Sequence, residues 1–214
     1  MRQIIAQLGF HLKVEYRSWP QIASLLLFMW CIAYVIYRVR PEITVSDFNF
    51  IYWIIVLLTS VSVAIRGTAH ARSGERLIMY SIVSPSTALI GLLLFNALYM
   101  LIVALALYLG MILLFYPQIT FSLSYLLVIV VGGSTIGIVL SFVSAISRYL
   151  DGQHTALSVL SIPLLIPSLI LSQNIGEELL NSGQLETDKF VILIALAMIS
   201  TALAILLFPY LWRE

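Results

Sequence analysis

Six long apolar segments separated by short polar stretches set the pattern of this chain. A helix needs about 20 apolar residues to cross a bilayer, and the six segments come close to or exceed that length. The predicted membrane-spanning helices are Gln21–Tyr37, Phe50–Ile65, Ala88–Tyr116, Leu123–Ile146, Thr155–Ser172 and Phe190–Leu211. None of them contains Asp, Glu, Lys, Arg or His. Because ionisable residues within a membrane usually mark ion or proton pathways, this argues against an ion-coupled carrier.

The composition also favours an all-α, polytopic membrane protein with one domain over residues 1–214. The chain is 61% apolar and 10% charged, and its mean hydropathy is +1.05. A soluble domain, by comparison, contains about 25% charged residues. The formal net charge of +1 suggests no nucleic-acid partner.

The basic residues divide unequally between the two sides of the predicted membrane. Cytoplasmic connections usually carry the excess of Lys and Arg. With both termini inside, the cytoplasmic side holds eight basic residues: Arg2, Lys13, Arg17, Arg66, Arg72, Arg76, Arg148 and Arg213. The opposite side holds three, Arg38, Arg40 and Lys189. We therefore expect a multi-pass protein with both termini in the cytoplasm.

Two flanking segments carry further predictions. Residues 1–20 predict an amphipathic helix on the cytoplasmic surface, turning into the first span at Pro20, with a frayed terminus as the alternative. The apolar residues on one face of this helix are Ile4, Ile5, Leu8 and Leu12. Residues 173–189 are expected to form the longest outer loop. A short helix packed against the membrane face is expected there, at Ile175, Leu179 and Leu180.

The loop over residues 66–85, RGTAHARSGERLIMYSIVSP, is basic and predicts a short helix of its own. Ser73 is a good N-cap, and Glu75 suits the positive end of the first turn. Pro85 disfavours α geometry at Ser84 and ends the element. The apolar side of this helix would be formed by Leu77, Ile78, Ile82 and Val83. This helix, with Arg72 and Arg76 near its start, could dock into a groove of a partner, or the loop could be a solvated positive-inside loop.

Other candidate chemistry is sparse. Gly132-Gly133-Ser134 only loosely resembles a serine nucleophile, and with Gly137 and Ser141 it is better interpreted as a strip of small residues for close helix packing. The three histidines are isolated, so their spacing predicts no metal or haem site. Pro163 and Pro167 predict either a kinked structural helix or a broken helix that serves as a hinge or lines a path.

Several short motifs follow one another in a characteristic order. They are Glu15-Tyr16-Arg17, Ser73-Gly74, Ser84-Pro85, Asn96, Pro163 with Pro167, and the ending Phe208-Pro209-Tyr210-Leu211-Trp212-Arg213. Over the whole chain, their order resembles the B subunit of the cytochrome c maturation transporter, a family also called haem exporter protein B. Two positions depart from it: the acid comes at Glu75, after Gly74 rather than before it, and Leu92 replaces a basic residue found in many members.

The resemblance implies an ABC-2-type exporter permease in the bacterial inner membrane. Residues 1–20 would be its elbow helix and residues 66–85 its coupling loop. The implied partners are a cytoplasmic ATPase subunit in two copies, a haem-handling C subunit and a small D subunit. ATP would bind the ATPase, and this chain would bind no cofactor and catalyse no reaction. The implied function in cytochrome c maturation is either export of haem as cargo or release of the haem-loaded chaperone from the C subunit. The expected ATPase contacts are Arg72, Ser73, Gly74, Glu75, Arg76, Leu77 and Tyr80, with a second contact at Arg148 and Asp151.

Two other functions stay open. An ABC-2 permease for a lipid-linked sugar or a drug would have a similar architecture. A structural membrane protein without an ATPase is the second alternative. An enzyme is the class we least expect, because the sequence contains no recognisable nucleophile, proton relay or metal cluster.

Overall fold

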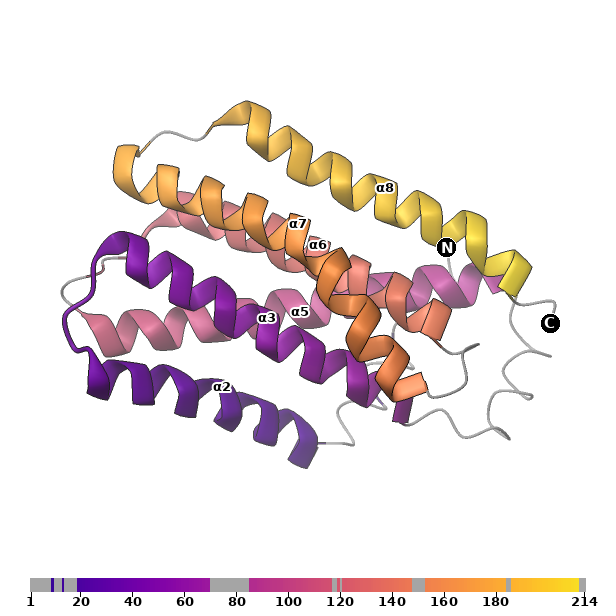
Figure 1. The fold of residues 1–214 in the computed structure, drawn as a ribbon, viewed down its shortest axis with the longest axis horizontal. Helices are drawn as coiled ribbons and strands as arrows, with labels where there is room; N and C mark the ends of the chain where they lie inside the picture. The colour runs from indigo at the N-terminus through magenta and orange to yellow at the C-terminus, as the bar shows by residue number, and fades with distance from the viewer. Residues whose placement is uncertain are drawn as a thin grey trace.

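The computed structural model describes residues 9, 13, 19–69, 85–116, 119, 121–147, 153–183 and 186–211. Six long helices contain nearly all of them, and the described part of the chain has no strand (Figure 1). The helices are α2 (Trp19–Val39), α3 (Val45–Ala69), α5 (Pro85–Phe115), α6 (Leu123–Ser147), α7 (Gln153–Ser182) and α8 (Thr187–Leu211). Each one contains a segment that the hydrophobic pattern predicts, and the fold is a helical bundle.

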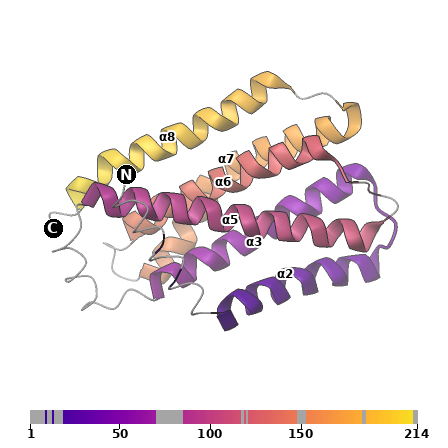
Figure 2. The same ribbon diagram turned by 180° about the vertical axis from the view of Figure 1, so that it is seen from behind.

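The helices alternate in direction, so their connections gather at the two ends of the bundle (Figures 1 and 2). We call one end the hairpin end, because α2–α3, α5–α6 and α7–α8 connect there. The opposite end holds the start of α2, the end of α3, the start of α5, the end of α6, the start of α7 and the end of α8. Both views place α2 and α8 at opposite edges.

Five of the helices are long and apolar enough to cross a membrane, which identifies a multi-pass membrane protein by length and composition. The five candidate spans are Ile22–Val39, Val45–Val63, Leu89–Phe115, Leu123–Val143 and Thr187–Leu206. The sixth predicted span lies in α7, which runs the length of the bundle (Figure 1). Its last turns are polar, with Gln173, Asn174, Glu177 and Glu178. That α7 also crosses the membrane stays a prediction.

Most of the segment expected as an outer loop, 173–189, is helical. Helix α7 continues to Ser182, and α8 begins at Thr187. Gly183 ends α7 with a φ of +70°, a left-handed conformation suited to glycine, and its N–H donates to the Leu179 carbonyl at 2.9 Å. Ile175 and Leu179 are buried in the bundle core. The expected short helix is thus the end of α7, packed against other helices and not against the membrane face.

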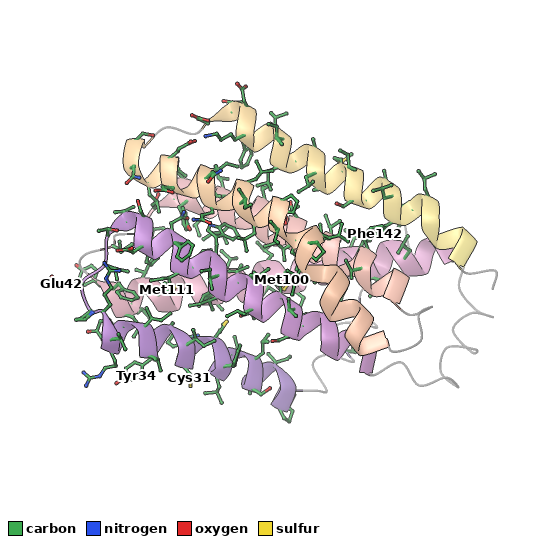
Figure 3. All side chains as sticks on the ribbon, in the orientation of Figure 1. Cys31, Tyr34, Glu42, Met100, Met111 and Phe142 are labelled. Atoms are coloured by element: carbon green, nitrogen blue, oxygen red, sulfur yellow. The ribbon has the colours of Figure 1, made fainter. Side chains whose placement is uncertain are left out.

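Helix α6 is the centre of the bundle. In its candidate span 67% of the residues are buried, against 17% in α2 and 11% in α8. It packs against α5, α7 and α8. Around it, aromatic side chains stack between helices, among them Tyr108 and Tyr125 with ring centroids 5.3 Å apart. Met100 and Met111 of α5, both fully buried, fill the adjoining interior (Figure 3).

Small residues let α6 approach its neighbours, as the sequence predicts. A Cβ atom on Gly137 would lie 2.4 Å from the Asn96 carbonyl oxygen and 2.7 Å from the Ala97 Cα atom, so the two backbones are in contact. A Cβ atom on Gly132 would lie 2.6 Å from Ser172 Oγ. Such close approach is common between membrane helices, where dispersion contacts and interhelical hydrogen bonds hold helices together.

Replacing Gly137 tests this crossing. Gly137→Ala should destabilise the folded protein by about 1–3 kcal/mol, because the methyl group meets the α5 backbone, which cannot move aside as a flexible side chain can. Gly133→Ala is the matched control, since its Cβ atom would lie 3.3 Å from the Ala104 Cβ atom. The measurement is thermal unfolding of each purified variant in one detergent. Equal melting temperatures for the two variants would contradict the backbone contact.

Candidate functional site

The predicted ATPase contacts lie outside the described residues. This applies to Arg72, Ser73, Gly74, Glu75, Arg76, Leu77 and Tyr80, and to the second pair, Arg148 and Asp151. The structure does place the helices that flank them. Ala69 ends α3 and Pro85 begins α5, while Ser147 ends α6 and Gln153 begins α7. All four helix ends lie opposite the hairpin end, so both predicted contact segments are attached to the same end of the bundle (Figure 1).

Several charges of the hairpin end form ion pairs. Arg40 lies 3.4 Å from Asp47 in an ion pair that is partly exposed. Asp47 also forms reciprocal hydrogen bonds with Thr44, at 3.2 and 3.3 Å, which cap the start of α3. Lys189 at the start of α8 pairs with Glu186 at 2.9 Å and with Glu178 of α7. The three basic residues predicted on one side, Arg38, Arg40 and Lys189, therefore share one end of the bundle; which side of the membrane it faces stays a prediction.

Pro163 and Pro167 lie inside α7, which continues through both of them. Both side chains are exposed. A proline within a helix removes one backbone hydrogen bond and clashes with the preceding turn, which bends or kinks the helix. The part of α7 nearer Gln153 does turn away from the direction of the rest (Figure 1). Whether this bend acts as a hinge stays a prediction.

A polar junction ties three helices together near the hairpin end. The Tyr125 hydroxyl of α6 donates to Asn49 Oδ1 of α3 at 2.8 Å, and Asn49 Nδ2 donates to the Gln173 carbonyl of α7 at 2.7 Å. Asn49 and Tyr125 are fully buried. Gly176 of α7 makes room for them, because a Cβ atom there would lie 2.5 Å from Asn49 Oδ1. One amide side chain thus links α3, α6 and α7.

One turn further into the bundle, the same three helices bury a hydroxyl that has no hydrogen-bond partner. It is Ser172 Oγ of α7, which lies near Trp53 of α3, and both residues are fully buried. A Cβ atom on Gly132 of α6 would touch both side chains, at 2.6 Å each. An unsatisfied buried polar group costs about 1–3 kcal/mol. We call this layer, which adjoins the hydrogen-bonded junction, the strained layer.

A second amide, which is half-buried, links α5 to α6. Asn96 Nδ2 donates to Ser141 Oγ at 2.8 Å, and Ser141 Oγ donates to the Gly137 carbonyl at 2.9 Å. Both residues stood out in the sequence, Asn96 through the family resemblance and Ser141 as a small residue. Asn49, Tyr125 and Gln173 were missed. The sequence signal that could have identified Asn49 is its position as a lone Asn at the start of an apolar run. Membrane helices use such amides in interhelical hydrogen bonds.

An open groove of about 720 Å³ lies between the ends of α7 and α8. Its lining is polar and has more acids than bases: Asn174, Glu177, Glu178, Asn181, Ser182, Glu186 and Lys189. Lys189 pairs with two of these acids, which holds α7 against α8. Among the described residues no three His, Cys, Asp or Glu side chains are grouped to hold a metal ion.

The polar junction can fix the relative position of three helices, because its neutral groups donate and accept hydrogen bonds. Its residues are not a nucleophile paired with a base. No protein-family model, curated protein or solved structure matches the chain.

Two serines of α7 test whether the inner layer is strained. Ser172→Ala should leave the melting temperature unchanged or raise it, because it removes an unpaired buried hydroxyl. Ser168→Ala should lower it by the equivalent of about 1 kcal/mol, because the Ser168 hydroxyl donates to the Leu165 carbonyl at 2.8 Å. Thermal unfolding under identical conditions compares the two. A larger loss for Ser172→Ala would show that its hydroxyl has a partner.

Proposed function

We propose that this chain is the permease subunit of an ATP-driven ABC-2-type complex that handles haem in bacterial cytochrome c maturation. Three observations support the proposal: the family resemblance, a bundle of six helices with five candidate spans, and the position of the helix ends to which the two predicted contact segments are attached. The last of these carries the argument. Residues 70–84 and 148–152 leave from helix ends at one end of the bundle, so a single cytoplasmic subunit can reach both.

The coupling proposed here works through packed helices. Residues 70–84 join α3 to α5, and residues 148–152 join α6 to α7. These four helices pack against one another, chiefly α5 on α6, α6 on α7 and α3 on α7. Because close-packed interiors transmit displacement instead of absorbing it, a shift of the loops would move the bundle. In this scheme ATP hydrolysis on the partner supplies the energy.

The remaining parts of the proposal follow from the resemblance. Two ATPase copies bind ATP on the cytoplasmic face, with Arg72 and Arg76 near the first contact and Arg148 and Asp151 at the second. The C and D subunits complete the complex in the inner membrane. Haem is cargo, either moved through the complex or carried by a chaperone that the complex releases from the C subunit.

Reversing two charges tests the ATPase contact. Arg72→Glu with Arg76→Glu should reduce the amount of ATPase subunit that copurifies with this chain at least about tenfold, since rim charges of opposite sign steer and hold partners. Arg38→Glu with Arg40→Glu makes the same change in net charge at the hairpin end and should leave copurification unchanged. Wild-type recovery with the first pair would exclude this contact.

Deletion of the gene tests the cargo. Cells lacking this chain should lose covalent haem attachment to c-type cytochromes, as seen by haem staining, while b-type cytochromes persist. The complex purified through this chain should contain the ATPase and the haem-handling subunit. Normal cytochrome c assembly together with a copurified ATPase would indicate a permease for another substrate. Absence of any ATPase would favour a structural protein.

A further inference from the structure

We infer that the hairpin-end part of α7, residues 168–182, is a hinged arm that the Asn49 hydrogen bonds latch onto α3 and α6. The inference goes beyond the proposed function, since it concerns this chain alone and holds whatever partner or cargo it has. It rests on three observations that meet on one helix: a latch, a strained layer and a hinge.

The latch consists of two hydrogen bonds made by one side chain. Among the described residues, one hydrogen bond joins α3 to α7: Asn49 Nδ2 donates to the Gln173 carbonyl at 2.7 Å. The Tyr125 hydroxyl holds the same amide from α6 at 2.8 Å. Because Gly176 has no side chain, the amide seats directly against the arm. Loss of either hydrogen bond therefore weakens the hold of α3 and α6 on α7 at one point.

The strained layer lies directly beneath the latch. Ser172 Oγ is buried without a hydrogen-bond partner when the arm lies against α3. If the arm swings away, this hydroxyl leaves the packed layer and can find a polar partner. Its burial therefore lowers the free-energy cost of opening.

The hinge lies at the other end of the arm. Pro163 and Pro167 interrupt the backbone hydrogen bonds of α7 just before residue 168, and both side chains are exposed. Hinges of this kind are a few residues that absorb the change in backbone angle. At the far end of the arm, Lys189 pairs with Glu178, so α8 would follow the motion.

Spin-label distances test the latch. Labels at Glu42→Cys, beside α3, and Asn181→Cys, on the arm, in a Cys31→Ser background report the separation by double electron–electron resonance. Both positions are exposed. With the latch intact, the two labels should show one narrow distribution of distances. Tyr125→Phe keeps the ring and removes the hydroxyl, so a second, longer distance should appear. The ratio of closed to open protein should fall about fivefold to tenfold, which is the effect of losing one hydrogen bond.

Matched variants separate a latch from general loosening. Asn49→Ala should add the same longer distance, and Asn96→Ala, which removes an interhelical amide between α5 and α6, should not. Adding Pro163→Ala and Pro167→Ala to Tyr125→Phe should shrink the longer-distance population. Three results would each overturn the inference. The first is an unchanged distance distribution in both folded latch variants, Tyr125→Phe and Asn49→Ala. The others are a longer distance with Asn96→Ala and no effect of the proline replacements.

Discussion

The close crossing of α6 with its neighbours is the constraint on which the rest of the structure depends. Gly137 puts the α6 backbone against the α5 backbone, and Gly132 brings α6 within reach of Ser172 and Trp53. Within a bilayer, lipid tails are as apolar as the side chains, so helix association depends on close packing and interhelical hydrogen bonds. Helix α6 supplies the first through its glycines. It supplies the second through Ser141, which accepts from the Asn96 amide, and Tyr125, which donates to the Asn49 amide.

The two amides divide the bundle into different regions. Asn96 joins α5 to α6 beside Gly137, where the backbones already touch, so its hydrogen bond reinforces a crossing that packing has set. Asn49 joins three helices at a place where the adjoining layer leaves the Ser172 hydroxyl unpaired. The same type of side chain thus reinforces a backbone contact in one place and adjoins an unpaired hydroxyl in the other. This contrast is the physical basis for expecting motion in α7 and not in α5.

The length and apolar character of the runs were sufficient to predict six helices, because long apolar runs in one chain allow few other structures. The boundaries were harder, and the reason is clearest in α7. Gln173, Asn174, Glu177 and Glu178 indicate an exposed loop by composition, yet Ile175 and Leu179 fall on the buried face of a continuing helix. Tertiary packing outweighed local polarity there. The polar junction could not be predicted, because Asn49, Tyr125 and Gln173 are far apart in the sequence and their meeting depends on helix positions that no local pattern specifies.

The two ends of the bundle have different proposed roles. The end that carries residues 70–84 and 148–152 is where a cytoplasmic subunit is proposed to dock, and the hairpin end carries the latch. Helices α3 and α7 reach both ends, and they pack against each other and against α6. A displacement of α3 at the docking end would therefore act on Asn49, which is four residues from the start of that helix. Because the latch depends on hydrogen bonds with strict distance limits and the neighbouring layer is strained, a small shift of α3 can be enough to release α7.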